Sequence, residues 1–244
     1  MTIQSNTFTA ILAAAGMLAL APQAVAENAE GWAGEGSLSA GTTSGNTETT
    51  DLGLGVDLAR TAGVWTYGVE AAADYGEIDG VETRNRYFLA GNVDRQINDR
   101  LFGFGRVSYE SDQFTGFDSR SFVGGGLGYS IYDNDTTTWS VRGGPGVKID
   151  ELRTTGETET SFGAVGRSEF GYAFNENVSL TNNTDVLYAE ESTQLANSIG
   201  VTAALTGALS ARVSFDVRYD TNPPLGFEDT DTATKIALVY GFGK

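Results

Sequence analysis

Residues Leu209–Asp220 read LSARVSFDVRYD, and their polarity changes at every step. A period of two sustained over twelve residues predicts a β-strand, because a helix would repeat its apolar positions every three or four residues. One face of this strand is apolar and the other is polar or charged, which is typical of a strand that separates lipid from a wet interior. The apolar face holds Leu209, Ala211, Val213, Phe215, Val217 and Tyr219, and the polar face holds Ser210, Arg212, Ser214, Asp216, Arg218 and Asp220.

Alternation of the same kind returns along most of the chain. It is clear in Gly63–Gly76, in Thr138–Asp150 and in Thr234–Phe242, and about twelve such segments lie between Gly31 and Phe242. A tilted strand crosses the hydrocarbon layer of a membrane in about 9–11 residues, so segments of this length suit membrane-spanning strands.

One segment, Leu101–Asp112, fits the alternation less well. The register that points Arg106 and Glu110 toward the polar side also points Phe102 and Phe104 there. We therefore expect a strand in this segment, with an inner face of mixed polarity.

The connectors between these segments alternate between short and long, and the long ones are acidic. The short ones are Arg60–Gly63, Ile97–Arg100, Tyr132–Thr136, Phe174–Asn177 and Thr206–Ala208. The long ones are Ser44–Thr50, Gly76–Thr83, Ser111–Ser119, Glu151–Ser161, Ala189–Thr193 and Asp220–Thr230. This pattern predicts an all-β fold, a transmembrane antiparallel up-and-down β-barrel of about 12 strands with its long loops outside the cell. A soluble barrel or sandwich in the periplasm is the alternative, but it would bury its apolar face.

The first 26 residues predict a signal peptide. The apolar run Phe8–Ala21 is too short for a spanning helix, and Ala24-Val25-Ala26 offers the small residues that a signal peptidase reads. No later stretch reaches the roughly 18 apolar residues of a transmembrane helix. We therefore expect residues 27–244 to form an outer-membrane β-barrel in a Gram-negative bacterium after cleavage.

The composition excludes several classes of chemistry. The net charge of −17 argues against nucleic acid as a partner, and the absence of cysteine excludes disulfides and thiolate metal sites. Histidine is also absent, so no Ser–His or Asp–His pair can form. We expect no enzyme activity and no cofactor. Catalysis by carboxylates alone is the remaining alternative, and the sequence does not distinguish a pair among Glu35, Asp57, Glu70 and Asp74.

The parity of the strands predicts which side chains line the barrel lumen. Two interpretations stay open: a pore whose charged walls select small solutes, or a ladder of ion pairs that fills a non-conducting barrel. The mixed signs of the charges favour neither. The predicted lumen residues are Glu70, Asp74, Arg84, Arg86, Arg106, Glu110, Arg142, Lys148, Arg167, Glu169, Arg212, Asp216, Arg218 and Lys235.

Two further features of the sequence have simple explanations. The acidic loops could bind divalent cations through oxygen ligands, but solvated loops are the more common case. Gly124-Gly125-Gly126 lies inside an alternating strand and lacks the Lys-Ser/Thr of a phosphate loop, so we interpret it as a site of close strand packing. The partners we expect are outer-membrane lipid and the barrel-assembly machinery, and we expect a monomer.

Short motifs near the start and the middle of the chain carry a family resemblance. They are Trp32 with Gly34, the turn from Thr43 through Thr47, and Gly126-Leu127-Gly128-Tyr129. In these motifs the chain resembles the YdiY-like family, described as salt-induced outer-membrane proteins. The resemblance implies an outer-membrane barrel whose biochemical function is not established. We therefore predict a small-solute diffusion channel or a salt-stress envelope protein, with a non-conducting structural or interaction barrel as the alternative.

Overall fold

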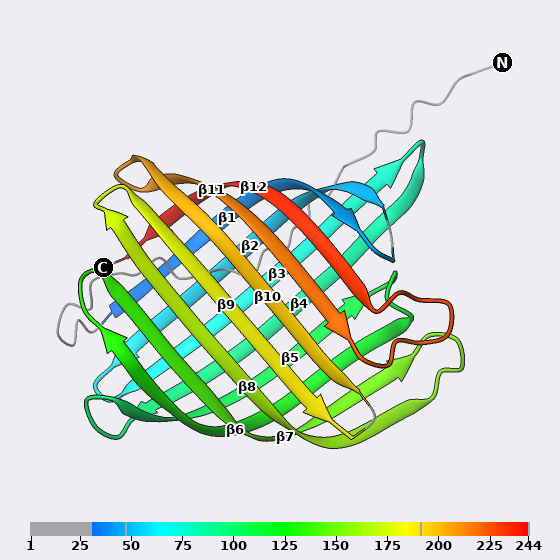
Figure 1. The fold of residues 1–244 in the computed structure, drawn as a ribbon, viewed down its shortest axis with the longest axis horizontal. Coiled ribbons are helices and arrows are strands. Elements are labelled where there is room, and N and C mark those ends of the chain that lie inside the picture. Colours follow the sequence, from blue (N-terminus) through cyan, green and yellow to red (C-terminus); the bar gives the residue numbers. More distant parts are fainter. Residues whose placement is uncertain (1–30, 47, 191, 244) are drawn as a thin grey trace, which may run out of the picture.

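In the computed structural model, residues 31–46, 48–190 and 192–243 are described, and they form a closed antiparallel barrel (Figure 1). Each strand pairs with the next along the chain, and the last pairs with the first. The predicted barrel of about 12 strands is confirmed, whereas the predicted signal peptide lies outside the described residues. The strands are β1 (Gly31–Ser44), β2 (Thr49–Ala62), β3 (Trp65–Ile78), β4 (Val81–Gln96), β5 (Leu101–Asp112), β6 (Phe117–Asp133), β7 (Thr137–Leu152), β8 (Thr158–Asn175), β9 (Val178–Ala189), β10 (Thr193–Thr206), β11 (Leu209–Asp220) and β12 (Thr230–Phe242).

The alternation of the sequence becomes the two faces of the barrel wall. In β11, Arg212 is 6% exposed on the inside, while its neighbour Val213 is 51% exposed on the outside. β11 pairs along its whole length with β10 and β12, so the parity of one strand sets the parity of the next. The polar face of the wall therefore encloses the lumen.

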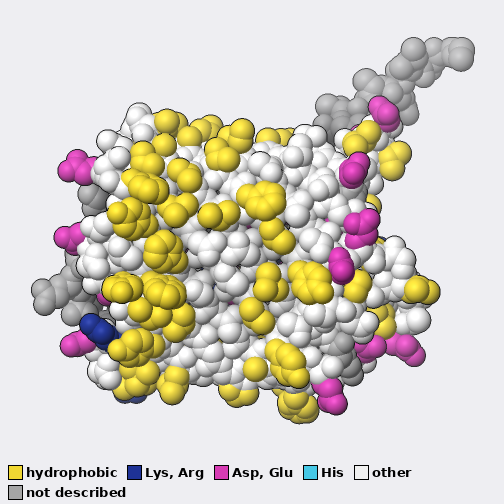
Figure 2. Space-filling view, viewed as in Figure 1, with side chains coloured by type: hydrophobic (Ala, Val, Ile, Leu, Met, Phe, Trp, Pro, Cys, Tyr) yellow, Lys and Arg dark blue, Asp and Glu magenta, His cyan; other side chains and the backbone are white. Residues whose placement is uncertain are grey.

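The outside of the wall is apolar. Figure 2 shows hydrophobic side chains spread over the wall between the two ends, where the acidic side chains gather. Exposed residues include Leu38 on β1, Leu89 on β4 and Ile236 on β12. A soluble barrel would bury such a face, so this surface matches lipid rather than water. No helix of the described residues is long and apolar enough to cross a membrane.

Strand β5 shows why its inner face mixes rings with charges. Phe102 and Phe104 both point inward and are buried. The ring of Phe102 covers Gly128 on β6 so closely that a Cβ atom there would overlap it. Phe122 likewise covers Gly124 and Gly146. The phenyl rings therefore fill space that inner-face glycines leave open.

The glycine run in β6 packs closely, as the sequence predicts. A Cβ atom at Gly126 would overlap the backbone carbonyl of Gly143 on β7, and one at Gly125 would lie 2.7 Å from the carbonyl oxygen of Phe104 on β5. Only glycine allows the backbones to approach so closely at these positions.

Most of the predicted long connectors are shorter in the structure, because the strands continue into them, and one of them is a tight turn. The expected long loop Gly76–Thr83 is a hairpin that projects beyond the end of the barrel (Figure 1), because β3 continues to Ile78 and β4 begins at Val81. Asp79 and Gly80 form the two-residue turn, with φ of 51° and 79°. Positive φ at both positions is what a tight hairpin of type I′ requires, and Asp-Gly supplies it. The longest connector, residues 221–229, lies at this same end, which we call the loop end.

Candidate functional site

The charged interior of the barrel is the candidate site. All fourteen residues that the sequence predicts for the lumen lie on the inner face, either buried or lining an internal cavity. They do not form one continuous ladder. One network contains Glu70, Arg106, Arg142, Arg167 and Glu169. A second contains Asp74, Arg84, Arg86, Glu110, Arg218 and Lys235. The remaining three contact separate neighbours and are Arg212, Lys148 and Asp216.

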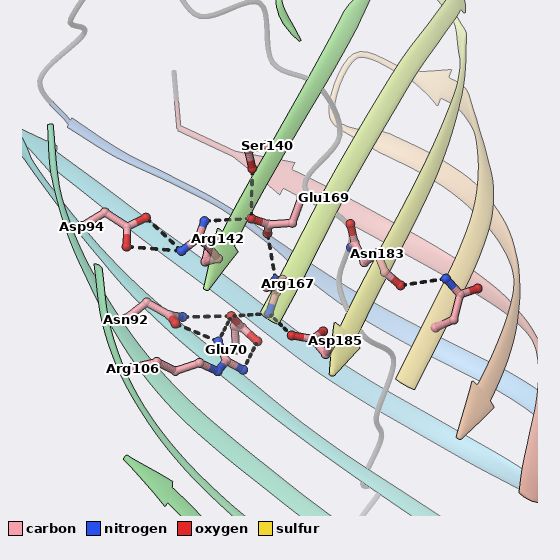
Figure 3. Close-up of polar contacts among 11 residues, drawn as sticks. Glu70, Asn92, Asp94, Arg106, Ser140, Arg142, Arg167, Glu169, Asn183 and Asp185 are labelled. Atoms are coloured by element: carbon pink, nitrogen blue, oxygen red, sulfur yellow. Dashed lines mark hydrogen bonds and ion pairs between the residues drawn. The ribbon is translucent and has the colours of Figure 1, made fainter. Parts of the chain in front are cut away.

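The first network crosses the lumen (Figure 3). Its charged members, which we call the partition, are Glu70, Asp94, Arg106, Arg142, Arg167, Glu169 and Asp185. They come from β3, β4, β5, β7, β8 and β9.

On one side of the partition, Arg106 holds Glu70. Nη1 of Arg106 donates to Oε1 of Glu70 at 2.9 Å, and its Nη2 donates to Oε2 at 3.2 Å. Asn92 donates to the same carboxylate at 2.9 Å and accepts from Arg106 at 2.7 Å. Charge-assisted bonds in two-pronged geometry set the relative orientation of the two groups.

On the other side, two arginines share Glu169. Arg142 donates to Glu169 at 2.7 Å and to Asp94 at 3.1 and 3.2 Å. Arg167 lies 3.1 Å from Glu169 through its Nε atom and 3.4 Å from Asp185 through Nη1. Nη1 of Arg167 also lies 3.8 Å from Oε1 of Glu70, which joins the two sides.

Two cavities meet at the partition. The larger, of about 230 Å³, extends from the loop end, and the smaller, of about 90 Å³, lies on the other side. Both are lined by Glu70, Arg106, Arg167 and Asp185, together with Val165. Side chains rather than backbone therefore separate the two spaces.

The connector 221–229 borders the larger cavity at the loop end. Pro223 and Pro224 line it. A Cβ atom at Gly116, in the connector between β5 and β6, would lie 2.8 Å from Cε2 of Phe227. Since β5 and β6 stand on the opposite side of the ring from β11 and β12, the connector reaches across the mouth. The backbone amide of Asn46 donates to Asp231 at 2.7 Å and ties its end to the β1–β2 connector.

Asp74 is the centre of the second network. Its carboxylate accepts from Nζ of Lys235 at 2.9 Å and lies 3.6 Å from Arg86 and 3.8 Å from Arg84. Arg86 also bonds Glu110, which lies 3.4 Å from Arg218 on β11. The network thus ties β3, β4 and β5 to β11 and β12 across the lumen.

Aromatic rings support several of the guanidinium groups. Arg142 lies over Phe102 and Phe104, with its Cζ atom 5.1 and 5.7 Å from the ring centroids, and Arg120 lies 3.5 Å over Phe117. These cation–π contacts hold the charges in place without neutralising them. The alternation of the sequence could indicate inward rings, but not which arginine each would support.

The site also contains residues that the predicted set lacks. Asp94 and Asp185 take the inward parity that the alternation of the sequence predicts for their strands, and Asn92 shares that parity on β4. Among the described residues, no three acidic side chains come close enough together to hold a metal ion. What this arrangement can do is present fixed charges of both signs along a narrow path.

Known structures share this architecture. The NanC porin matches with a TM-score of 0.57 at 10% identity, covering 84% of this chain and 98% of that one. The translocator domain of the autotransporter NalP from Neisseria meningitidis matches at 0.55 and 13% identity, covering 89% and 91%. The COG4313 outer membrane channel from Pseudomonas putida F1 matches at 0.53 and 10% identity, covering 87% and 96%. These likenesses show that the chain has the fold of outer-membrane β-barrels.

A sequence relative confirms the resemblance drawn from the motifs. Uncharacterized protein YdiY of Escherichia coli (strain K12) is 24% identical over 214 residues, which cover 84% of this chain and 82% of that protein. A family profile matches residues 36–242, nearly the whole barrel. The chain therefore belongs to the family described as protein of unknown function, DUF481.

Proposed function

We propose that this protein is an outer-membrane channel for small ions and solutes, with the partition as its narrowest point. One observation carries the proposal: the same four charged side chains, Glu70, Arg106, Arg167 and Asp185, line the cavities on both sides. A path interrupted only by side chains can open through small movements of those side chains. A channel also accounts for a charged interior inside an apolar wall.

The apolar outer surface supports a location in the outer membrane. Ile236, Leu238 and Tyr240 present a continuous apolar row to the outside of β12, beside inward Lys235 and Val239. Lipid is therefore the natural partner of the wall. The absence of histidine from the chain supports a role without catalysis, because no general base of ordinary pKa near neutrality is present.

Single-channel recording in planar bilayers tests the proposal. We expect discrete openings from the refolded wild-type barrel and a larger unitary conductance from Arg167→Ala, because this substitution removes a side chain shared by both cavities. Arg153→Ala is the matched control. It removes an arginine that forms an ion pair with Asp118 at the loop end, away from both cavities, so the conductance should not change. Absence of channel openings in all three proteins across a wide voltage range would overturn the proposal.

A non-conducting barrel is the second candidate, and one observation favours it. Arg106, Arg142 and Arg167 are each already paired with carboxylates, as in a filled, salt-bridged interior. Under this alternative, Arg167→Ala destabilises the barrel but creates no openings. Cation binding by the acidic outer loops and a role in the response to salt remain predictions of the sequence.

A further inference from the structure

Three carboxylates stand side by side on the inner wall, next to the partition. In the register of the sheet, Glu35 on β1 lies opposite Asp57 on β2, and Asp57 lies opposite Glu70 on β3. Directly opposed side chains on one face of a sheet lie about 5 Å apart at their Cβ atoms, and like charges at that spacing repel. Such a row is stabilised when cations compensate its charges or when one of its members takes up a proton.

The two outer carboxylates of this row have their cations within the protein. Glu35 accepts from Nη1 and Nη2 of Arg212 at 2.8 and 3.0 Å. Glu70 is held by Arg106 at 2.9 Å and by Asn92. Each outer member of the row is therefore neutralised by a guanidinium group from a strand two places away around the ring, Arg212 on β11 and Arg106 on β5.

The middle carboxylate is different. Asp57 is only 7% exposed, and it lines the smaller cavity. Within the described part of the chain it forms neither a hydrogen bond nor an ion pair. The charged groups that act on it most strongly are Glu70, Glu35, Arg167 and Glu169, three of them acidic. Arg167 itself forms ion pairs with Glu169 and Asp185. A buried carboxylate without a partner is costly unless a cation or water supplies what the protein does not.

The two cavities share this acidic excess. Five carboxylates and three guanidinium groups line the smaller cavity. Seven carboxylates and five guanidinium groups line the larger one. Acidic linings at a constriction favour cations and repel anions. Because no three acids converge as metal ligands among the described residues, the arrangement suits an ion in transit rather than a resident metal.

We propose that the permeating species are small monovalent cations and that Asp57 is the carboxylate that binds them in passage beside the partition. This inference rests on the proposed channel function and names its substrate class. The cation occupies the smaller cavity and compensates the middle member of the Glu35–Asp57–Glu70 row. It then passes the partition into the larger cavity, whose acidic lining continues to the loop end.

The test is the reversal potential of the refolded full-length barrel in a planar bilayer under a gradient of potassium chloride. We expect the wild-type protein to prefer potassium over chloride. Asp57→Asn keeps the shape of the side chain but removes its charge, so it should shift the reversal potential toward zero. Asp57→Ala should do the same, and it provides a second variant if the amide disturbs folding. Asp118→Asn is the control, because Asp118 lies at the loop end and pairs with Arg153.

The outcomes separate the two proposals. A conducting wild-type barrel that prefers chloride, or that shows no preference, overturns cation selectivity and leaves the channel standing. Selectivity that is unchanged in both Asp57 variants overturns the role of that residue. Absence of conductance in every protein overturns the channel itself, and cation passage with it. Heat-modifiable migration on a gel confirms that each variant is folded before recording.

Discussion

Arg167 on β8 places its Nη1 atom 3.8 Å from Oε1 of Glu70 on β3, five strands away around the ring. A long side chain from one wall thus meets a carboxylate from another, and the contact lies between the two cavities. This contact joins charged side chains from two parts of the wall into the partition across the lumen. It also predicts how substitutions at the two positions combine.

The effects of Arg167→Ala and Glu70→Gln on conductance should not be additive. Each substitution loosens the same constriction, so the second acts on a path that the first has already widened. The measurement is the unitary conductance of both single variants and of the double variant. If the change in the logarithm of the conductance of the double variant equals the sum of the changes of the two single variants, the shared constriction is contradicted. The pair Arg153→Ala and Glu77→Gln, at the loop end, should leave the conductance unchanged in every combination.

Asp74 should be the most sensitive charge in the barrel for stability. It is 1% exposed and compensates Arg84, Arg86 and Lys235. Removing one partner of a buried ion pair typically costs about 3–5 kcal/mol, because the remaining charges stay buried without compensation. Asp74→Ala should lower the free energy of unfolding by that order in urea titrations with lipid vesicles.

The control for Asp74 lies on the same hairpin. Glu77 is exposed and accepts a hydrogen bond from the Tyr75 hydroxyl at 2.8 Å. Glu77→Gln should change the free energy of unfolding by less than about 0.5 kcal/mol, as is usual for surface substitutions. Equal losses at the two positions would contradict the central role of Asp74.

Gly126 should be essential for folding, whereas Gly166 should not. A Cβ atom at Gly126 would overlap the backbone of Gly143 and Gly144, so alanine would force β6 and β7 apart. At Gly166, on β8, the same atom would meet nothing within 4 Å. Refolding yields, measured by heat-modifiable migration on a gel, should fall sharply for Gly126→Ala and stay at the wild-type level for Gly166→Ala. A normal yield for Gly126→Ala would show that the close approach of the strands is not required.

A charge on the apolar outer surface of the barrel should lower the free energy of unfolding only where that surface lies within the hydrocarbon layer of the membrane. Ile236 in the middle of β12 and Val81 at the projecting β3–β4 hairpin are both 64% exposed. Arginine on the lipid face at the bilayer midplane costs about 2–4 kcal/mol, and near the interface about 0–1 kcal/mol. Unfolding in lipid vesicles should therefore show a large loss for Ile236→Arg and little for Val81→Arg. The predicted difference depends on a lipid bilayer around the barrel, so the measurement in vesicles is the one that tests it.

The connector 221–229 should be held across the mouth by Phe227. Its ring packs against Gly116, while Leu225 in the same connector is fully exposed. Phe227→Ala should release the connector, and cleavage at Glu228 by a glutamate-specific protease should become faster. Leu225→Ala removes an apolar side chain of similar size but no such contact, so its cleavage rate should match the wild type. Identical rates for all three proteins would show that the ring does not anchor the connector.

Much of the fold follows from local features of the chain. The alternation in Leu209–Asp220 sets both the strand and its two faces, because successive side chains of a strand point in opposite directions. Asp79-Gly80 allows a tight turn, although the acidic residues around it suggested a loop. The structure has an extended hairpin there instead of a loop, because β3 and β4 stay paired up to the turn, with Glu77 opposite Glu82 and Ile78 opposite Val81.

By itself, the sequence determined the barrel and the face that each strand side chain takes, because these depend on periodicity within a few residues. Only the tertiary structure decided which charges meet. Arg218 and Glu110 are 108 residues apart in the chain and 3.4 Å apart in the lumen. Ring closure and strand stagger create such contacts, and no local pattern records them. Ring closure and strand stagger also leave Asp57, which lies between two neutralised carboxylates, without a partner among the described residues.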